Sequence, residues 1–221
     1  MSRDERGPIL VINPNSNERV TAGLSEALDP FRFHGGPAIE CLTLTEGPFG
    51  IESQVDSDSV VLPLVRTVQG RPDAAAFVIA CYSDPGIDAC RSLSEAPVFG
   101  IQESGLLTAL ARGDRIGIIA VAQPSIRRHR LYMRRMGALD RVAGERSADM
   151  SVDESTRGNR TLDRLTEVGR ALLGDGADAI VLGCAGMAVH CAPLEDALGV
   201  PVIEPTQAAV AMALGAVLAR A

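Results

Sequence analysis

The sequence predicts an α/β protein of two pseudo-symmetric halves, each a mainly parallel sheet flanked by helices, with the active-site cleft between them. Short apolar runs alternate with helical patterns along the whole chain, and these runs are continuous rather than alternating. Continuous apolar strands separated by helices are typical of a parallel sheet that is covered on both faces. Three motifs of the first half also recur in the second half, in the same order and at nearly one spacing.

The recurring motifs are the evidence for a duplicated architecture. They are F-V-I-A-C (77–81) and I-V-L-G-C (180–184), A-P-V-F-G (96–100) and V-P-V-I-E (200–204), and N-P-N-S (13–16) and A-Q-P-S (122–125). A spacing of about half the chain is far too long for a solenoid repeat. We therefore expect two equivalent α/β halves, approximately residues 1–95 with 205–221, and residues 96–204.

The individual elements follow from local patterns. Ser16 or Asn17 caps the helix that runs to about Leu28, and Asp84 is the expected N-cap of the helix at 87–93. The expected strands are apolar runs of four to six residues: 8–12, 39–43, 76–81, 98–101, 115–120, 179–184 and 200–203. The expected helices follow a cap or show helical spacing of apolar residues: 17–28, 56–69, 87–93, 126–136, 162–173, 187–198 and 206–219.

Composition and charge restrict the classes of partner. The formal net charge is −7 and aromatic residues make up only 3% of the chain. An acidic protein with few aromatic side chains is poorly suited to bind nucleic acid or an anionic membrane. The longest apolar stretch, Ala208 to Ala219, is too short to span a bilayer, and we expect no signal peptide before the first strand. We expect a cytoplasmic protein that acts on a small molecule and binds neither nucleic acid nor membrane.

The chain has five cysteines and three histidines. An odd cysteine count without a C-x-x-C motif argues against a disulfide framework, a zinc ribbon and a thioredoxin motif. His190 and Cys191 could form a metal site together with Cys81, but standard ligand spacing is missing. We therefore predict no metal.

Cys81 and Cys184 are the candidate catalytic residues. Each follows a buried strand at an equivalent point of the repeat, and ligands of open α/β sheets bind at the carboxyl ends of the strands. Two thiols that face one cleft from opposite sides suit the removal of a proton from one face of a carbon and its return to the other. Cysteine fits this task because its ordinary pKa of about 8.5 is close to working pH.

The alternative is that both cysteines are small buried core residues, which is common for free cysteine. The protein would then be a non-catalytic small-molecule binder on the same fold. We interpret the remaining three cysteines, which lack this context, as structural: Cys41, Cys90 and Cys191.

With these residues in view, the sequence resembles the Asp/Glu/hydantoin racemase superfamily, most closely its hydantoin and allantoin racemase branch. The resemblance rests on blocks that span nearly the whole chain: V-I-N-P-N-S (11–16), G-P-x-x-I-E-S (47–53), V-I-A-C-Y-S-D-P-G-I-D-A (78–89), P-V-F-G-I-Q-E (97–103), V-L-G-C-A-G-M-A (181–188) and G-V-P-V-I-E-P (199–205). It implies a cofactor-independent two-base racemase, a homo-oligomer, that uses Cys81 and Cys184. A decarboxylase or a maleate-type cis–trans isomerase of the same fold remains an alternative.

The resemblance also implies a set of substrate-binding residues. Asn13 and Ser83 match positions that line the substrate site, and Ala185 and Gly186 match positions that contribute backbone donors. Gln123, beside the strand end at 120, is a further candidate.

Several polar residues near the strand ends have more than one interpretation. Asp84 is a candidate for substrate binding that either orients Ser83 or only caps a helix. Glu103 either polarises a group in the cleft or starts a helix. Tyr82 either walls the pocket or packs under the sheet. The arginines of 127–135 resemble a binding patch, although a solvated helix face or a subunit contact is favoured in an acidic protein.

Overall fold

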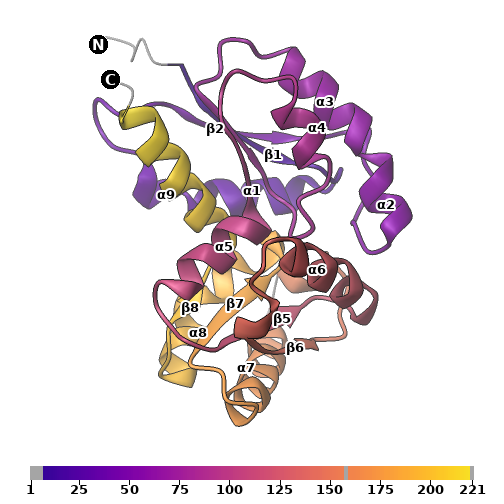
Figure 1. Cartoon of the computed structure of the whole chain (residues 1–221), viewed down its shortest axis with the longest axis vertical. Helices are drawn as coiled ribbons and strands as arrows, with labels where there is room; N and C mark the ends of the chain where they lie inside the picture. Colours follow the sequence, from indigo (N-terminus) through magenta and orange to yellow (C-terminus); the bar gives the residue numbers. More distant parts are fainter. Residues whose placement is uncertain (1–6, 157–158, 220–221) are drawn as a thin grey trace.

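The computed structural model describes residues 7–156 and 159–219, which contain two four-stranded sheets. The order in the first sheet is β2 (Ile39–Thr43), β1 (Ile9–Asn13), β3 (Ala76–Ile79) and β4 (Val98–Gly100). The order in the second is β6 (Val142–Ser147), β5 (Ile116–Ala120), β7 (Ala179–Gly183) and β8 (Val202–Ile203). All strand pairs are parallel, and the two orders correspond strand by strand. The predicted fold of two equivalent α/β halves is confirmed (Figure 1).

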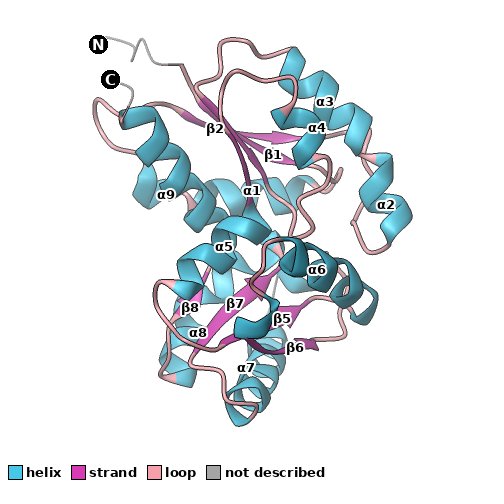
Figure 2. Ribbon diagram, viewed as in Figure 1, coloured by secondary structure: helices cyan, strands magenta, loops and turns pink. Residues whose placement is uncertain are grey.

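Helices cover both faces of each sheet, as Figure 2 shows. The helices are α1 (Glu18–Ala27), α2 (Gln54–Ser59), α3 (Val61–Gln69), α4 (Ile87–Arg91), α5 (Ile101–Leu110), α6 (Gln123–Arg135), α7 (Asn159–Gly174), α8 (Cys191–Leu198) and α9 (Pro205–Leu218). Short 3-10 turns are η1 (Asp29–Phe31), η2 (Leu139–Arg141), η3 (Glu154–Thr156) and η4 (Ala185–His190). The C-terminal α9 returns to the first half, where it packs against β1, β3 and β4 (Figure 1).

Side chains of β1 and β3 divide between two cores because successive residues of a strand point to opposite faces. Leu10 and Phe77 belong to a cluster under α3 and α4. Val11 and Val78 face the other way, into a larger cluster that continues through α5 and α9 into the second half. This continuous core holds the two halves together and keeps the carboxyl ends of their strands close to one another.

Two expected helices differ from the structure. The helix expected at 56–69 is divided at Val60, and its first part begins earlier because Ser53 and Asp56 form a capping box. The helix expected at 187–198 starts as the 3-10 turn η4 and becomes α-helical only at Cys191.

Two elements were not expected, and one expected boundary cuts through a sheet. β6 is a half-exposed edge strand without a continuous apolar run, and α5 is buried on several sides, so neither shows a clean amphipathic pattern.

β4 pairs with β3 in the first sheet, although the approximate boundary at residue 96 assigned it to the second half. The division of the chain into two domains stays a prediction.

None of the helices in the described part of the chain combines the length and the apolar character that crossing a bilayer requires.

Candidate active site

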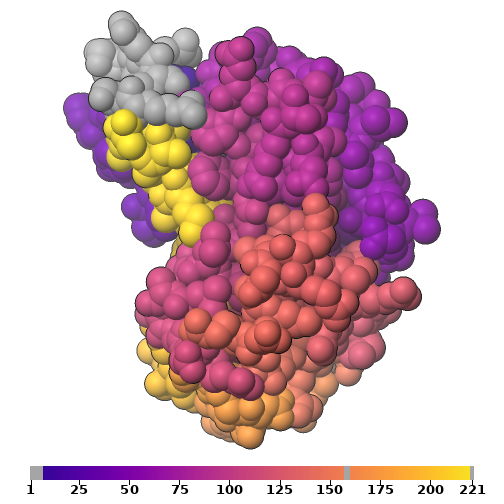
Figure 3. Space-filling model, in the orientation of Figure 1, coloured from indigo at the N-terminus to yellow at the C-terminus, as the bar shows by residue number. Residues whose placement is uncertain are grey.

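The two cysteines line one small cavity between the halves. Cys81 follows β3 after one further residue, and Cys184 follows β7 directly. The cavity that both line has a volume of about 30 Å³, which is room for about two water molecules. On the face that Figure 3 shows, α6 packs directly against the first half.

The backbone after Cys81 forms a tight turn. Ser83 N and Asp84 N both donate to the Cys81 carbonyl oxygen, at 2.8 and 2.9 Å. Asp84 has a positive φ of 42°, which Asp tolerates better than most residues. The turn directs the Asp84 carboxylate to the start of α5, where it accepts hydrogen bonds from Gln102 N at 2.9 Å and Glu103 N at 3.0 Å.

This arrangement corrects the expected cap of the helix at 87–93. Its N-cap is Gly86, in a left-handed conformation, while Asp84 caps α5 instead. The sequence pattern was misleading because Asp84 and Pro85 have the spacing of a local cap, whereas the turn directs the carboxylate to another helix. Glu103 starts α5, as one of its two interpretations held, and its side chain pairs with Arg91 and Tyr132.

Cys184 is held by the turn after β7 and by η3. Its Sγ lies 3.7 Å from Ser155 Oγ, and the Ser155 hydroxyl donates to the Val152 carbonyl oxygen at 2.7 Å. Because a hydroxyl has one hydrogen, this pattern leaves Ser155 Oγ as the acceptor for the Cys184 thiol. Gly186 permits the approach, since a Cβ there would lie 2.6 Å from Ser155 Oγ.

Burial dominates the acidity of both thiols. The pKa of Cys81 is raised to about 12, chiefly by burial and also by a negative charge on Cys184, while Arg128 acts to lower it. Burial also raises the pKa of Cys184, while the Gly186 N–H lowers it. Neutral thiols are therefore favoured in this cavity, and a thiolate depends on the groups that lower the pKa.

Arg128 lines the cavity, although the arginine run that contains it favours a solvated helix face or a subunit contact over a binding patch. Its Nε donates to Ser83 Oγ at 3.3 Å, its Nη2 to Ser125 Oγ at 3.1 Å and its Nη1 to the Glu52 carbonyl oxygen at 3.3 Å. It thus connects α6 of the second half to two loops of the first half. The sequence feature that could have indicated this position is that Arg128 comes three residues after Ser125, which places both side chains on one face of the helix.

A buried pair forms another part of the wall. His129 Nδ1 lies 2.5 Å from Glu145 Oε1, and both side chains are buried. The rings of Tyr82 and His129 meet edge to face, with centroids 5.0 Å apart. Both rings line the cavity, so Tyr82 walls the pocket as one of its two interpretations held.

The structure brings some of the predicted substrate-binding residues to the cavity and places others elsewhere. Ser83, Ala185 and Gly186 line it together with the two cysteines. Asp84 lies behind it at α5, and Gln123 is exposed in a groove beside α7.

Asn13 is buried behind the cavity wall. Its Nδ2 donates to Asn15 Oδ1 at 3.0 Å and to Thr21 Oγ1 at 3.0 Å. It therefore fixes the loop that carries Asn15, and Asn15 rather than Asn13 lines the cavity. The N-P-N-S motif contains both residues, and its sequence alone does not distinguish the inward amide from the one at the cavity.

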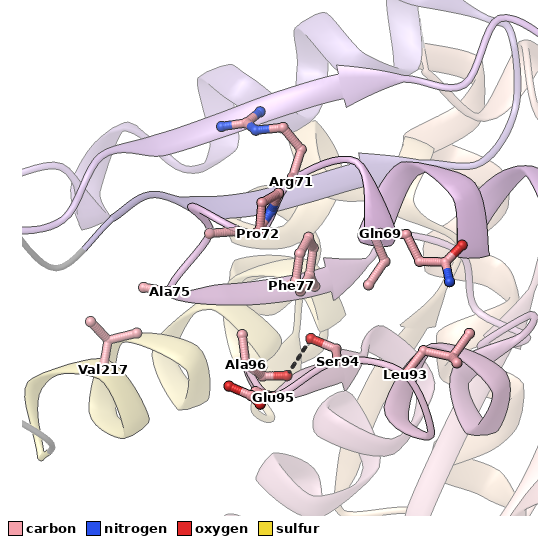
Figure 4. A pocket seen from close by; sticks show the side chains of 12 residues that line it. Gln69, Arg71, Pro72, Ala75, Phe77, Leu93, Ser94, Glu95, Ala96 and Val217 are labelled. Atoms are coloured by element: carbon pink, nitrogen blue, oxygen red, sulfur yellow. Dashed lines mark hydrogen bonds between the residues drawn. The ribbon is translucent and has the colours of Figure 1, made fainter.

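Larger hollows lie both beside this cavity, where one of about 310 Å³ shares Ala185 and Gly186 with it, and far from it. One of about 550 Å³ lies at the opposite end of the first sheet, beside the start of β3, and has no cysteine or histidine in its lining. Figure 4 shows Arg71, Phe77 and Val217 around it. Among the residues that the structure describes, no group of three or more His, Cys, Asp or Glu side chains could hold a metal ion.

The fold and the cavity define a class of protein: a duplicated α/β protein with two titratable thiols at equivalent strand ends. Comparison with known proteins identifies the family. The chain belongs to the Asp/Glu/hydantoin racemase family, whose model matches residues 9–213.

Named relatives agree with this assignment. The hydantoin racemase of Paenarthrobacter aurescens is 34% identical over 213 residues, which cover 91% of this chain and 87% of that protein. The hydantoin racemase of Rhizobium meliloti is 34% identical over 211 residues, with 93% and 86% covered. The solved structure of allantoin racemase from Klebsiella pneumoniae has a TM-score of 0.89 and 29% identity, and the match covers 97% of this chain and 89% of that one. Family and relatives identify the protein as an isomerase of the racemase class.

Proposed function

We propose that the protein is a cofactor-independent two-base racemase that inverts the acidic C–H centre of a hydantoin-like or ureido compound. The observation that carries this proposal is that Cys81 and Cys184 come from equivalent strand ends and line one cavity. The substrate class is supported by the hydantoin and allantoin racemases among the similar proteins.

The proposed reaction uses the thiols in turn. The C5–H of a hydantoin lies next to a carbonyl group, so its loss gives an enolate. One cysteine, as the thiolate, takes this proton and becomes a thiol, while the other thiol gives its proton to the opposite face and becomes the thiolate. The Ser83 hydroxyl and the Arg128 guanidinium are donors within the cavity that suit a carbonyl or enolate oxygen.

Substrate entry requires the cavity to open. A hydantoin ring is larger than the cavity of about 30 Å³ that the two thiols line. Loops of the two halves meet beside the cavity, where Glu52 Oε1 accepts from Val152 N at 3.2 Å and Asn17 Nδ2 donates to Asp153 Oδ1 at 3.2 Å. We expect these contacts to separate when substrate binds and to form again around it, which excludes water from the enolate.

Proton exchange in D2O, followed by NMR and polarimetry, tests the proposal. The panel is single-enantiomer 5-substituted hydantoins, allantoin, aspartate and glutamate, with wild type, Cys81→Ser and Cys184→Ser. Cys41→Ser is the matched control, because Cys41 lies in β2 and outside the cavity.

We expect wild type and the control to lose optical activity as deuterium enters a hydantoin, and each cavity variant to stop racemising it. Consumption of an arylmalonate or maleate without exchange would favour a decarboxylase or a cis–trans isomerase instead. Binding of a panel compound without any reaction would favour a non-catalytic binder.

We also propose that the protein works as a homo-oligomer in the cytoplasm. All five cysteines are free, and a reducing compartment keeps catalytic thiols from forming disulfides. Light scattering coupled to size-exclusion chromatography gives the oligomeric state, and a monomer at working concentration would contradict that part.

A further inference from the structure

We propose that the hollow of about 310 Å³ between α1 and η4, beside the cysteine cavity, is a substituent pocket that takes an uncharged apolar group at C5 of the hydantoin ring. Its role rests on the proposed function. It narrows the substrate class from hydantoin-like or ureido compounds to hydantoins with an apolar substituent.

The reaction itself limits where a substituent can lie. C5 of the enolate is planar, so its two faces point to the two thiols and its substituent lies in the plane of the ring. One pocket at the edge of the cysteine cavity therefore serves both enantiomers. Because each half of the protein provides one thiol, that pocket lies where the two halves meet.

The hollow has this position. Val20, Ala185 and Gly186 line both the hollow and the cysteine cavity, so the two spaces adjoin. Val20 belongs to α1 of the first half, whereas Ala185 directly follows Cys184 and begins η4 of the second half. The cavity of about 30 Å³ has no room for a substituent. The hollow has the volume of the smaller ligand pockets of proteins, which is about 300 Å³.

The lining of the substituent pocket favours an apolar group. Among the described residues, seven of the ten that line it are valine, alanine or glycine. The Thr156 hydroxyl donates its hydrogen to the Asp153 carbonyl oxygen at 2.7 Å, so it has none left for a ligand. A ureido group would lose hydrogen bonds to water in such a pocket, whereas an alkyl group gains free energy by leaving water.

The charged residues of the pocket are exposed to water. The Arg19 side chain is 66% exposed and lies 3.6 Å from Asp153 Oδ1, and Glu26 is exposed as well. Water and counterions screen such charges, so they attract a charged ligand only weakly. Val189, by contrast, is an exposed apolar side chain that a substituent would cover. The pocket therefore selects by size and apolar character rather than by charge.

Gly23 keeps the pocket open on the side of α1. A Cβ there would meet none of the described atoms within 4 Å outside its own stretch of helix. A larger side chain at this position therefore causes no clash and fills part of the pocket. Gly215 in α9 is the matched control, because it is also an exposed helix glycine with open space at its Cβ position, and it lines neither hollow.

Proton exchange in D2O compares compounds that differ only at C5. They are hydantoin itself, which has no substituent, both enantiomers of 5-isobutylhydantoin, and both enantiomers of allantoin, whose substituent is a ureido group. The proteins are wild type, Gly23→Ala, Gly23→Leu and Gly215→Leu, and kcat and KM are determined for each pair.

We expect Gly23→Leu to lower kcat/KM for 5-isobutylhydantoin about tenfold or more, the effect of a mismatch in an apolar pocket. The loss should arise mainly in KM and be the same for both enantiomers, because one pocket holds the substituent of each. Hydantoin should lose much less, since it places nothing in the pocket. Gly23→Ala should have an intermediate effect, and Gly215→Leu should act on all compounds alike.

A second measurement does not depend on turnover. The Cys81→Ser/Cys184→Ser variant lacks both cavity thiols, and isothermal titration calorimetry gives its Kd for each compound. We expect 5-isobutylhydantoin to bind about tenfold or more tightly than hydantoin and than allantoin. Gly23→Leu in the same background should remove that difference.

The outcomes separate the pocket from the proposed function. If wild type exchanges none of these compounds, the proposed function fails, while calorimetry still decides what the pocket binds. If Gly23→Leu affects hydantoin and 5-isobutylhydantoin equally, or neither, the inference is overturned and the racemase proposal stands. Tighter binding of allantoin than of 5-isobutylhydantoin would overturn the apolar class. A changed oligomeric state of Gly23→Leu in light scattering would also overturn the inference, because the hollow would then be a contact between copies of the chain.

Discussion

Asp84→Ala tests how the loop after Cys81 is tied to the helix between the halves. The Asp84 side chain is only 3% exposed, and its carboxylate accepts the two backbone N–H groups that start α5, at 2.9 and 3.0 Å. A buried donor without a partner costs about 1–3 kcal/mol, and the loss of a helix cap typically costs about 1 kcal/mol. Burial raises the pKa of Asp84 to about 8, which shows that the buried carboxylate is itself unfavourable. Its removal in Asp84→Ala therefore offsets part of the lost stability. We expect a net destabilisation of about 2–4 kcal/mol.

Urea unfolding followed by circular dichroism measures this change, since the chain has no tryptophan. The matched control is Asp88→Ala, four residues further on, where the carboxylate pairs with Arg135 and both side chains are 67% exposed. A surface substitution of this kind costs about 0.5 kcal/mol or less. If Asp84→Ala lowers the free energy of unfolding no more than Asp88→Ala does, the Asp84 cap of α5 does not contribute to stability and the expectation is refuted.

Three further predictions concern pH, the second thiol and the cavity wall. Burial raises the pKa of Glu204 to about 7, above its unfolded value of about 4.3, so the folded state binds more protons between these values. This contribution to stability is present below about pH 4 and is lost as the pH rises through about 7. Glu204→Gln should therefore flatten the fall in urea stability between about pH 4 and 7, and an unchanged slope would contradict this. Gly186→Ala places a Cβ 2.6 Å from Ser155 Oγ, so we expect kcat for racemisation to fall about tenfold or more, the effect of roughly 1.4 kcal/mol; a wild-type kcat would show that Ser155 is free to move. His129→Ala leaves Glu145 buried without its partner and should cost about 3–5 kcal/mol in urea unfolding, and a double-mutant cycle with Glu145→Ala should recover part of that cost. Additive losses in that cycle would mean that the pair is not coupled.

The amino-acid sequence by itself determined the repeated core of this protein. Strands such as β3 and β7 are continuous apolar runs, and burial on both faces leaves that pattern in the sequence whatever the partners are. The same runs end at Cys81 and Cys184, so the repeat alone predicts that these two positions are equivalent. The helix cap at Asn17 is predictable for a similar reason, because it depends on residues next to it in the chain.

Only the tertiary structure decided which side chains meet. Arg128 lies in a basic helix whose pattern is that of a solvated face, yet packing of α6 on the first half brings it to Ser83. Asp84 has the local pattern of a cap for α4 but caps α5 instead. α5 is buried between the halves and β6 is an edge strand, so neither carries the periodicity that marks a surface element. Local patterns report burial and spacing, whereas contacts between segments far apart in the chain depend on how the two halves pack.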